Sequence, residues 1–223
     1  MTPSAKVSTR TVPVDTIYVL SITEAAKIPA AWCEEQFPRR MERARKFRRE
    51  EDRLRCIAAG ALEVYALGVR ESGIVLDERG KPTAPERGVF FSVSHSGDYA
   101  VLALSDREVG TDIEKIEDAR LAVAERVFTP EELLWMREDA QERFYILWTL
   151  KESVSKLDGR GLSLPMESCS VLPMIRGESI LLDGKRLFGT SQRFANCILS
   201  LCSAEKAERI ELNILTAGEI LGK

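Results

Sequence analysis

The alternation of apolar and polar residues divides the chain into expected strands and helices. Residues 16–22 form a short β-branched run that predicts an opening strand. Through residues 37–67, apolar residues recur at three- and four-residue steps, which predicts a helical region. Two more strands are expected at residues 89–93 and 99–104, and the Gly-containing link of residues 94–98 is typical of a hairpin.

The second half of the chain shows a similar order of elements. An alternating run that ends at residue 114 predicts a strand, and a helix is expected over residues 142–157. Short alternating runs fill residues 162–214, and the clearest of them covers residues 193–202. These runs favour an antiparallel sheet.

This repeated order predicts an α+β fold of two pseudo-symmetric lobes, each a small antiparallel sheet packed with helices. Residues 1–107 would form the N-terminal lobe and residues 108–223 the C-terminal lobe. A chain of 223 residues is long enough for two lobes of this size. The cleft between the lobes would be the natural ligand site.

Composition and charge narrow the class of protein. The chain is 44% hydrophobic and 30% charged, which is typical of a soluble globular protein, and its net charge of −3 gives no general attraction to nucleic acid. The first ten residues lack the apolar run of a signal peptide, and no apolar stretch approaches a membrane span. The five cysteines contain no CxxC pair. We therefore expect a cytoplasmic protein with reduced thiols and no zinc site.

Two pairs of charged residues are candidates for metal and phosphate chemistry. Asp112 and Glu114 stand two residues apart in an expected strand, so both carboxylates would point to one face. Such a pair suits Mg²⁺, although it also fits a solvated strand end. Glu152 and Lys156 are spaced i, i+4 on the expected helix and share a face there.

Other candidates have two interpretations each. The basic run of residues 39–55 is either a solvated helix face with i, i+4 ion pairs or a site for a multiply charged phosphate ligand. His95 is the single histidine, and serines flank it on both sides, which would suit an anion. Glu132 follows Thr129 and Pro130 at the third position of an expected helix, so it is either a capping-box acid or a catalytic one.

Five segments together resemble the signature motifs of the 4′-phosphopantetheinyl transferases, in the same order. The length of the chain and the order of its motifs are similar to those of the surfactin-synthetase-activating group, a monomer of two pseudo-symmetric lobes. One departure is Thr111, where the family usually has Ile or Val, and another is the use of arginines where relatives often have lysines. The matching segments are residues 79–82, 92–97, 109–114, 148–156 and 159–165.

The resemblance implies a ligand set. Coenzyme A would lie in the cleft between the lobes, and Mg²⁺ on its pyrophosphate would be held by Asp112, Glu114 and Glu152. The nucleotide and its phosphates would be bound by Arg40, Arg43, Arg55, Lys81, Ser94, His95 and Lys156. The protein would move phosphopantetheine to a serine of an apo acyl or peptidyl carrier protein, without nucleic acid or membrane partners.

The resemblance also implies catalytic roles. Glu152 is the first candidate for the base that takes the serine proton and Glu132 the second, while Lys156 would stabilise or protonate the leaving phosphate. Two rival functions use the same residues: a metal-dependent phosphohydrolase and a catalytically silent module that binds carrier proteins. The hydrolase would be expected to carry a richer His/Asp cluster, and the intact acids and lysine count against the silent module.

Overall fold

Two four-stranded sheets carry the described part of this computed structural model, residues 15–222. The first sheet has the order β10-β1-β5-β4 and the second the order β6-β9-β8-β7, and a two-stranded hairpin, β2-β3, stands beside them. The strands are β1 (Thr16–Ser21), β2 (Val75–Leu76), β3 (Pro82–Thr83), β4 (Phe90–Ser96), β5 (Tyr99–Ser105), β6 (Val109–Lys115), β7 (Ser179–Leu182), β8 (Lys185–Phe194), β9 (Cys197–Ser203) and β10 (Glu211–Leu215).

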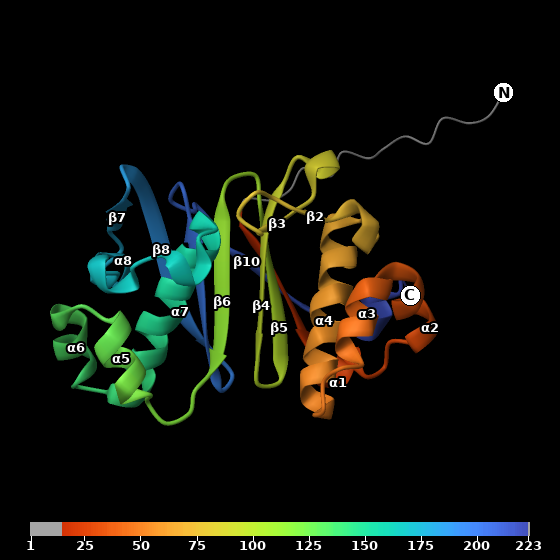
Figure 1. Cartoon of the computed structure of the whole chain (residues 1–223), viewed down its shortest axis with the longest axis horizontal. Helices are drawn as coiled ribbons and strands as arrows, with labels where there is room; N and C mark the ends of the chain where they lie inside the picture. Colours follow the sequence, from red (N-terminus) through yellow and green to blue (C-terminus); the bar gives the residue numbers. More distant parts are fainter. Residues whose placement is uncertain (1–14, 223) are drawn as a thin grey trace.

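Helices cover the outer side of each sheet, so that the two sheets lie in the middle of the molecule (Figure 1). The first sheet is covered by α1 (Ile22–Ala25), α2 (Ala30–Gln36), α3 (Pro38–Ala44), α4 (Glu50–Leu67) and the C-terminal α9 (Ala217–Ile220). The second is covered by α5 (Leu121–Val127), α6 (Pro130–Met136), α7 (Ala140–Asp158) and α8 (Leu172–Ile175). Short 3₁₀ turns lie at Glu71–Gly73, Pro85–Arg87, Gly161–Ser163 and Met166–Ser168.

Three hydrophobic clusters hold these layers together. One packs α4 on the first sheet around Leu62 and Leu102, and a second packs α7 on the second sheet around Leu147 and Ile198. The third lies between the sheets and joins residues of β1 and β5 to residues of β6 and β9, including Val109. Burial of apolar surface on both faces of each sheet therefore fixes the position of the two sheets relative to each other.

The α+β class is confirmed, and strands form near the expected positions. The link expected at residues 94–98 is shorter, because β4 continues to Ser96 and only Gly97 and Asp98 turn, so His95 lies in a strand. The run of residues 193–202 is not one strand but the end of β8 and most of β9, divided by a turn at residues 195–196.

Local chemistry explains the shifts at other element ends. The opening strand stops at Ser21 because this residue caps α1, where its hydroxyl accepts from the backbone N–H of Glu24. The helical region expected at 37–67 is two helices, α3 and α4, separated at residues 45–49. Helix α7 begins two residues early because Asp139 caps it.

The last strand differs from the expected arrangement. We expected residues 162–214 to form an antiparallel sheet in the C-terminal half, but β10 lies in the first sheet and pairs in parallel with β1. The other pairs of the two four-stranded sheets are antiparallel. Residues 204–210 carry the chain from β9 to β10, so the C-terminal strand can complete the N-terminal sheet. The division into lobes at residues 107/108 stays a prediction.

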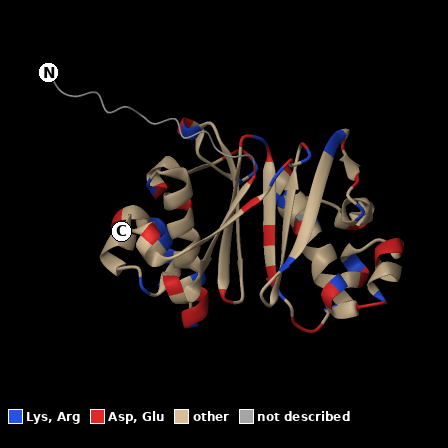
Figure 2. Cartoon of the chain, turned by 180° about the vertical axis from the view of Figure 1, so that it is seen from behind, with Lys and Arg blue, Asp and Glu red and all other residues tan. Residues whose placement is uncertain are grey.

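Charged residues are distributed over the helices, loops and some strands of both halves (Figure 2). Among the described residues, no helix is both long and apolar enough to cross a membrane. The first ten residues, in which we saw no signal peptide, lie outside the described part of the chain.

Candidate active site

Strands β4 and β6 come from different sheets and meet through side chains. Ser94 Oγ donates to Asp112 Oδ1 at 2.6 Å, and Ser96 Oγ donates to Glu114 Oε2 at 2.6 Å. Ser92 Oγ accepts from the backbone N–H of Thr111 at 3.0 Å. Side chains two residues apart point to the same face of a strand, so the alternate serines of β4 form one row of hydroxyls along β6. We call this row, Ser92, Ser94 and Ser96, the serine row.

Lys156 completes a compact polar cluster at the middle of this row. Its Nζ lies 2.6 Å from Asp112 Oδ1 and 2.8 Å from Ser94 Oγ. Asp112 is 4% exposed, and its second carboxylate oxygen is buried without a hydrogen-bond partner. A buried carboxylate oxygen without a donor is costly, so the cluster has capacity for one more cationic or donating group.

Close backbone approach brings α7 to β6 at Gly110. A Cβ at this position would lie 2.0 Å from the carbonyl oxygen of Ser153 and 2.6 Å from the backbone nitrogen of Leu157. Because no side chain fits between strand and helix, only glycine permits this spacing. Asp112 and Lys156 lie on the two elements that meet there, so Gly110 contributes directly to the short distance between them.

Glu114 and Glu152 add negative charge to the cluster. Burial raises the pKa of Glu114 above its ordinary value, and Asp112 raises it further, whereas the Ser96 hydroxyl lowers it. Burial likewise raises the pKa of Glu152, with further increases from Asp112 and Glu114 and an opposing effect of Lys156. The three acids therefore repel one another in a site where Lys156 supplies part of the counter-charge.

The described residues contain no group of three or more His, Cys, Asp or Glu side chains arranged to hold a metal ion. The cluster nevertheless has the donor chemistry of a single hard cation. Its ligand atoms would be the free Oδ2 of Asp112 and the carboxylate of Glu114 on the same strand face. A bound cation would also relieve the repulsion among the acids. These features fit Mg²⁺ on two carboxylates with remaining positions open to water or phosphate.

His95 and Arg55 lie together on the other face of β4. With Ser96 and Glu114 they line a cavity of about 730 Å³. Arg55 Nη1 donates to the carbonyl of Gly97 at 2.6 Å, and its other nitrogen pairs with Asp52. Loss of water contact lowers the pKa of His95, and the nearby cations Lys156, Arg55 and Arg40 lower it further. Four cations and five carboxylates line this cavity, so its surface is of mixed charge, and the arginines are the candidates for phosphate contacts within it.

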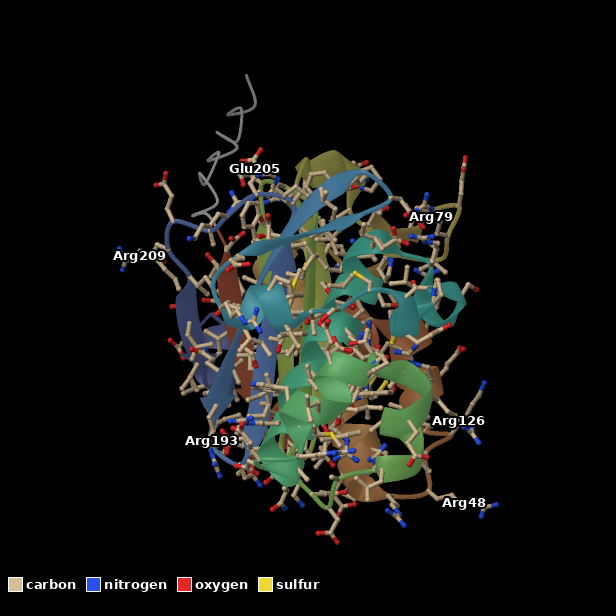
Figure 3. All side chains as sticks on the ribbon, turned by 90° about the vertical axis from the view of Figure 1, so that its left-hand side faces the viewer. Arg48, Arg79, Arg126, Arg193, Glu205 and Arg209 are labelled. Carbon is tan, nitrogen blue, oxygen red and sulfur yellow. The ribbon has the colours of Figure 1, made fainter. Side chains whose placement is uncertain are left out.

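Arg40 and Arg43 line a separate cavity of about 520 Å³. Arg40 is engaged in the protein itself, since its Nη2 lies 2.5 and 2.6 Å from the two oxygens of Glu63. Arg43 is exposed. Further along the same run, Arg48 projects away from the molecule (Figure 3). The basic run thus combines both interpretations: some members are solvated or internally paired, and Arg43 faces a cavity.

Lys81 lies on the β2–β3 hairpin and reaches the second half of the chain. Its Nζ donates to the backbone carbonyls of Val109 at 3.2 Å and Leu157 at 3.0 Å. It also lines a cavity of about 280 Å³ that includes Lys156. Burial lowers the pKa of the Lys81 ammonium, while Glu108, Asp77 and Asp158 oppose this effect.

Glu132, the second candidate base, lies in the capping box that its spacing with Thr129 predicts, and its oxygens do not contact the acidic cluster; its role as a base stays a prediction. Its Oε2 accepts from the backbone N–H of Thr129 at 2.8 Å and lies 2.9 Å from Lys151 Nζ. Its Oε1 accepts from the backbone N–H of Val171 at 2.7 Å. The residue is fully buried, so both oxygens are committed to a capping box and an internal ion pair.

The sequence interpretation missed Ser92 and Glu63, and it gave Ser96 only as a donor for an anion. Ser92 and Ser96 hydrogen-bond to β6, and their alternate spacing with Ser94 was the signal that could have revealed a shared face. Glu63 is the buried partner of Arg40, and no local pattern connects residues 23 positions apart. Long-range ion pairs of this kind require the fold to be known.

Comparison with known proteins agrees with the motifs. The 4′-phosphopantetheinyl transferase superfamily matches residues 108–202, the segment that contains Asp112, Glu152 and Lys156. The 4′-phosphopantetheinyl transferases ffp and Sfp of Bacillus subtilis are 38% and 36% identical over 58% and 60% of this chain. The aligned segments span somewhat less than two thirds of these relatives, 63% and 65%.

A longer match comes from another species. The 4′-phosphopantetheinyl transferase psf-1 of Bacillus pumilus is 30% identical over 177 residues, which cover 72% of this chain and 73% of that protein. The resemblance seen in the five motifs is confirmed by this match, because it extends well beyond the segment of the acids. The chain belongs to the 4′-phosphopantetheinyl transferase superfamily.

Proposed function

We propose that this protein transfers the 4′-phosphopantetheine group of coenzyme A to a serine hydroxyl of an apo carrier protein and releases 3′,5′-ADP. The observation that carries the proposal is the cluster of Asp112, Glu114, Glu152 and Lys156 where β6 meets α7, bordered by cationic residues. Membership in the superfamily supports the choice of reaction over other uses of such a cluster.

We propose that Asp112, Glu114 and Glu152 hold one Mg²⁺. The unpartnered Oδ2 of Asp112 and the raised pKa values of the two glutamates support this assignment, because both features are relieved by a bound cation. Bound Mg²⁺ would neutralise charge on the pyrophosphate of coenzyme A. Two carboxylates with open positions are the usual protein share of a magnesium–phosphate site.

The remaining roles belong to side chains of this chain. Lys156 lies within 2.6 Å of Asp112, where its ammonium would stabilise negative charge on the leaving phosphate and donate a proton to it. Glu152 is the proposed base for the carrier serine. Its raised pKa makes the carboxylate a better proton acceptor, although a metal contact would reduce that basicity.

Cationic side chains around the cluster would bind the other phosphates of the coenzyme. We propose that His95 and Arg55 border the pyrophosphate and that Arg43 meets the 3′-phosphate. His95 and Arg55 line one cavity together with Glu114, and Arg43 lines another. Ser94 orients Asp112 and Lys156 by its two hydrogen bonds. Arg40 remains a candidate for the 3′-phosphate because it lines the same cavity as Arg43, although its guanidinium already donates to Glu63.

We also propose a monomeric cytoplasmic enzyme that acts on carrier proteins and does not engage nucleic acid or membranes. The net charge of −3 supports the absence of a general nucleic-acid function. Two lobes with the site between them remain part of this proposal, with the boundary at residues 107/108.

The deciding experiment is incubation of the protein with coenzyme A, Mg²⁺ and a purified apo carrier protein, followed by intact-mass analysis. A gain of one phosphopantetheine on the carrier, with release of 3′,5′-ADP, is expected. Release of phosphate without a mass gain would establish the phosphohydrolase instead. Carrier binding without either product would establish the silent module.

A further inference from the structure

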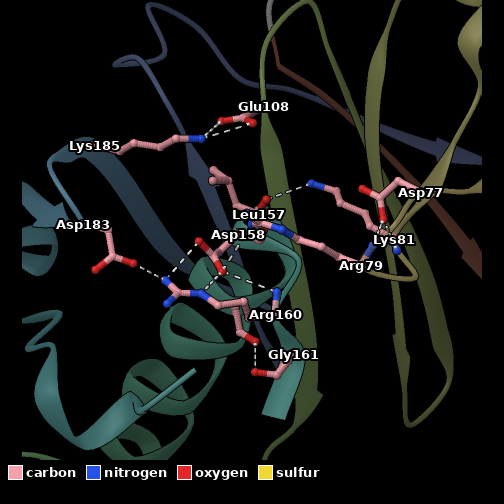
Figure 4. A network of polar contacts seen from close by, with 11 residues as sticks. Asp77, Arg79, Lys81, Glu108, Leu157, Asp158, Arg160, Gly161, Asp183 and Lys185 are labelled. Carbon is pink, nitrogen blue, oxygen red and sulfur yellow. Dashed lines mark hydrogen bonds and ion pairs between the residues drawn. The ribbon is translucent and has the colours of Figure 1, made fainter. Parts of the chain in front are cut away.

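The β2–β3 hairpin contacts the C-terminal end of α7 through two cationic side chains. Arg79 Nη1 donates to the carbonyl of Asp158 at 2.7 Å, and Lys81 Nζ donates to that of Leu157 (Figure 4). The last carbonyls of a helix have no partner within it, and cations are favoured at this end of the helix dipole. The hairpin thus supplies donors that α7 lacks.

Lys81 also binds the strand that carries the acids. The same Nζ donates to the carbonyl of Val109, so one ammonium joins β6 to α7. Val109 lies three residues before Asp112, and Leu157 directly follows Lys156. The bridge therefore connects the two elements next to the residues whose 2.6 Å contact forms the cluster.

The turn that presents Lys81 is itself fixed. The backbone N–H groups of Arg79 and Lys81 both donate to Asp77 Oδ1, at 2.9 and 2.8 Å. The backbone N–H of Asp77 donates in turn to the carbonyl of Lys81 at 2.9 Å. A turn closed in this way leaves the lysine stem little freedom, so its ammonium is held at the two carbonyls.

We propose that Lys81 is a positioning residue that sets the spacing of β6 and α7, and through it the geometry of Asp112 and Lys156. Two of the three ammonium hydrogens are used on backbone carbonyls, which are strong charge-assisted bonds. The consequence for catalysis rests on the proposed function. The mechanical part, that Lys81 holds helix to strand, does not.

The first test is hydrogen–deuterium exchange on the full chain with Lys81→Met, which keeps the stem and removes the donors. We expect at least about threefold faster exchange in the last turn of α7 and at the start of β6, with other elements unchanged. Lys185→Met is the matched control, since Lys185 belongs to the same network but makes an exposed ion pair with Glu108. It should change neither segment.

The second test compares the kinetics of the same variants. A displaced helix should lower kcat of Lys81→Met on the order of 10- to 100-fold at nearly unchanged KM for coenzyme A. Lys81→Arg, which keeps charge and donors, should recover most of the rate. If Lys81→Met does not fold, Lys81→Gln shortens the side chain but keeps a donor, and it should show the same pattern at smaller size.

The outcomes test the positioning role of Lys81 separately from the proposed transferase activity. Unchanged exchange at α7 and β6 would overturn the bridge, and so would faster exchange throughout the chain. A raised KM for coenzyme A with unchanged kcat would make Lys81 a coenzyme contact and overturn the positioning role. Lower stability with unchanged kcat and KM would also overturn the positioning role. If the wild-type protein transfers nothing, the proposed function fails, and the exchange measurement alone decides whether Lys81 joins β6 to α7.

Discussion

Replacing Arg40 with methionine removes the cation of a buried ion pair and leaves Glu63 without its partner. The two side chains are 13% and 4% exposed, and both carboxylate oxygens lie within 2.6 Å of Arg40 Nη2. Removing one partner of a buried pair typically costs about 3–5 kcal/mol. The free energy of unfolding of a protein is roughly 5–15 kcal/mol, so we expect the Arg40→Met protein to fold with greatly reduced stability.

The size of this loss should depend on pH with a definite sign. Burial raises the pKa of Glu63 above its ordinary value of 4.5, and Arg40 opposes the rise. Without Arg40 the pKa in the folded state rises further. The folded protein then holds a proton that the unfolded chain has released, so stability is lost as the pH rises through the folded pKa. The deficit of Arg40→Met should therefore grow from about pH 5 to about pH 8.

Urea unfolding followed by circular dichroism at these two pH values measures the effect. The double variant Arg40→Met/Glu63→Leu is the internal control, because an apolar pair in a buried ion-pair site is often neutral in stability. We expect it to recover most of the loss and to lose the pH dependence. A deficit of Arg40→Met below about 1 kcal/mol, or one that shrinks toward high pH, would refute the reasoning from the buried pair.

Three further predictions address the site. Glu114→Gln should abolish Mg²⁺-dependent transfer. It should also raise the melting temperature of the metal-free protein at pH values above the raised pKa of Glu114, because the ionised side chain is destabilising there. A melting temperature below that of the wild type would contradict this. Arg43→Met should weaken coenzyme A roughly 10- to 150-fold in calorimetry but 3′-dephospho-coenzyme A much less, and equal losses would return Arg43 to a solvated role. Glu152→Gln should keep coenzyme A binding and lose turnover, whereas Glu132→Gln should mainly lower the free energy of unfolding by a few kcal/mol; the reverse result would make Glu132 the base.

Local patterns predicted the elements of the fold because local chemistry determines them. Thr129 and Glu132 form the capping box that their spacing indicates, and Gly159 ends α7 in the left-handed conformation that favours glycine. The position of β10 was not predictable in this way. Its short alternating run is compatible with either sheet, and its parallel pairing with β1 depends on contacts across the whole chain. Period-2 patterns identify a strand but not its neighbour.

In the candidate site, too, local patterns predicted some features, and others depend on long-range contacts. The spacing of Asp112 and Glu114, and of Glu152 and Lys156, placed the acids and the lysine on shared faces, and the structure brings Asp112 and Lys156 into contact. Side chains that serve the protein interior could not be separated from ligand-binding ones by type. Arg40 is an arginine in a basic run, but its buried partner Glu63 lies on another helix and is known only from the fold.

The meeting of β4 and β6 determines how Asp112 and Glu114 are held. Strands paired by backbone hydrogen bonds lie about 4.8 Å apart and leave no room for polar side chains between them. Here the serine row supplies the hydrogen bonds between β4 and β6, beside the apolar cluster that packs the rest of the contact between the sheets. A side-chain hydrogen bond contributes only about 1 kcal/mol, and a phosphate or cation can replace it by a stronger charged interaction. The row therefore joins the two sheets at the acids. Under the proposed function, a phosphate or cation at Asp112 and Glu114 would replace these side-chain bonds without breaking a backbone ladder.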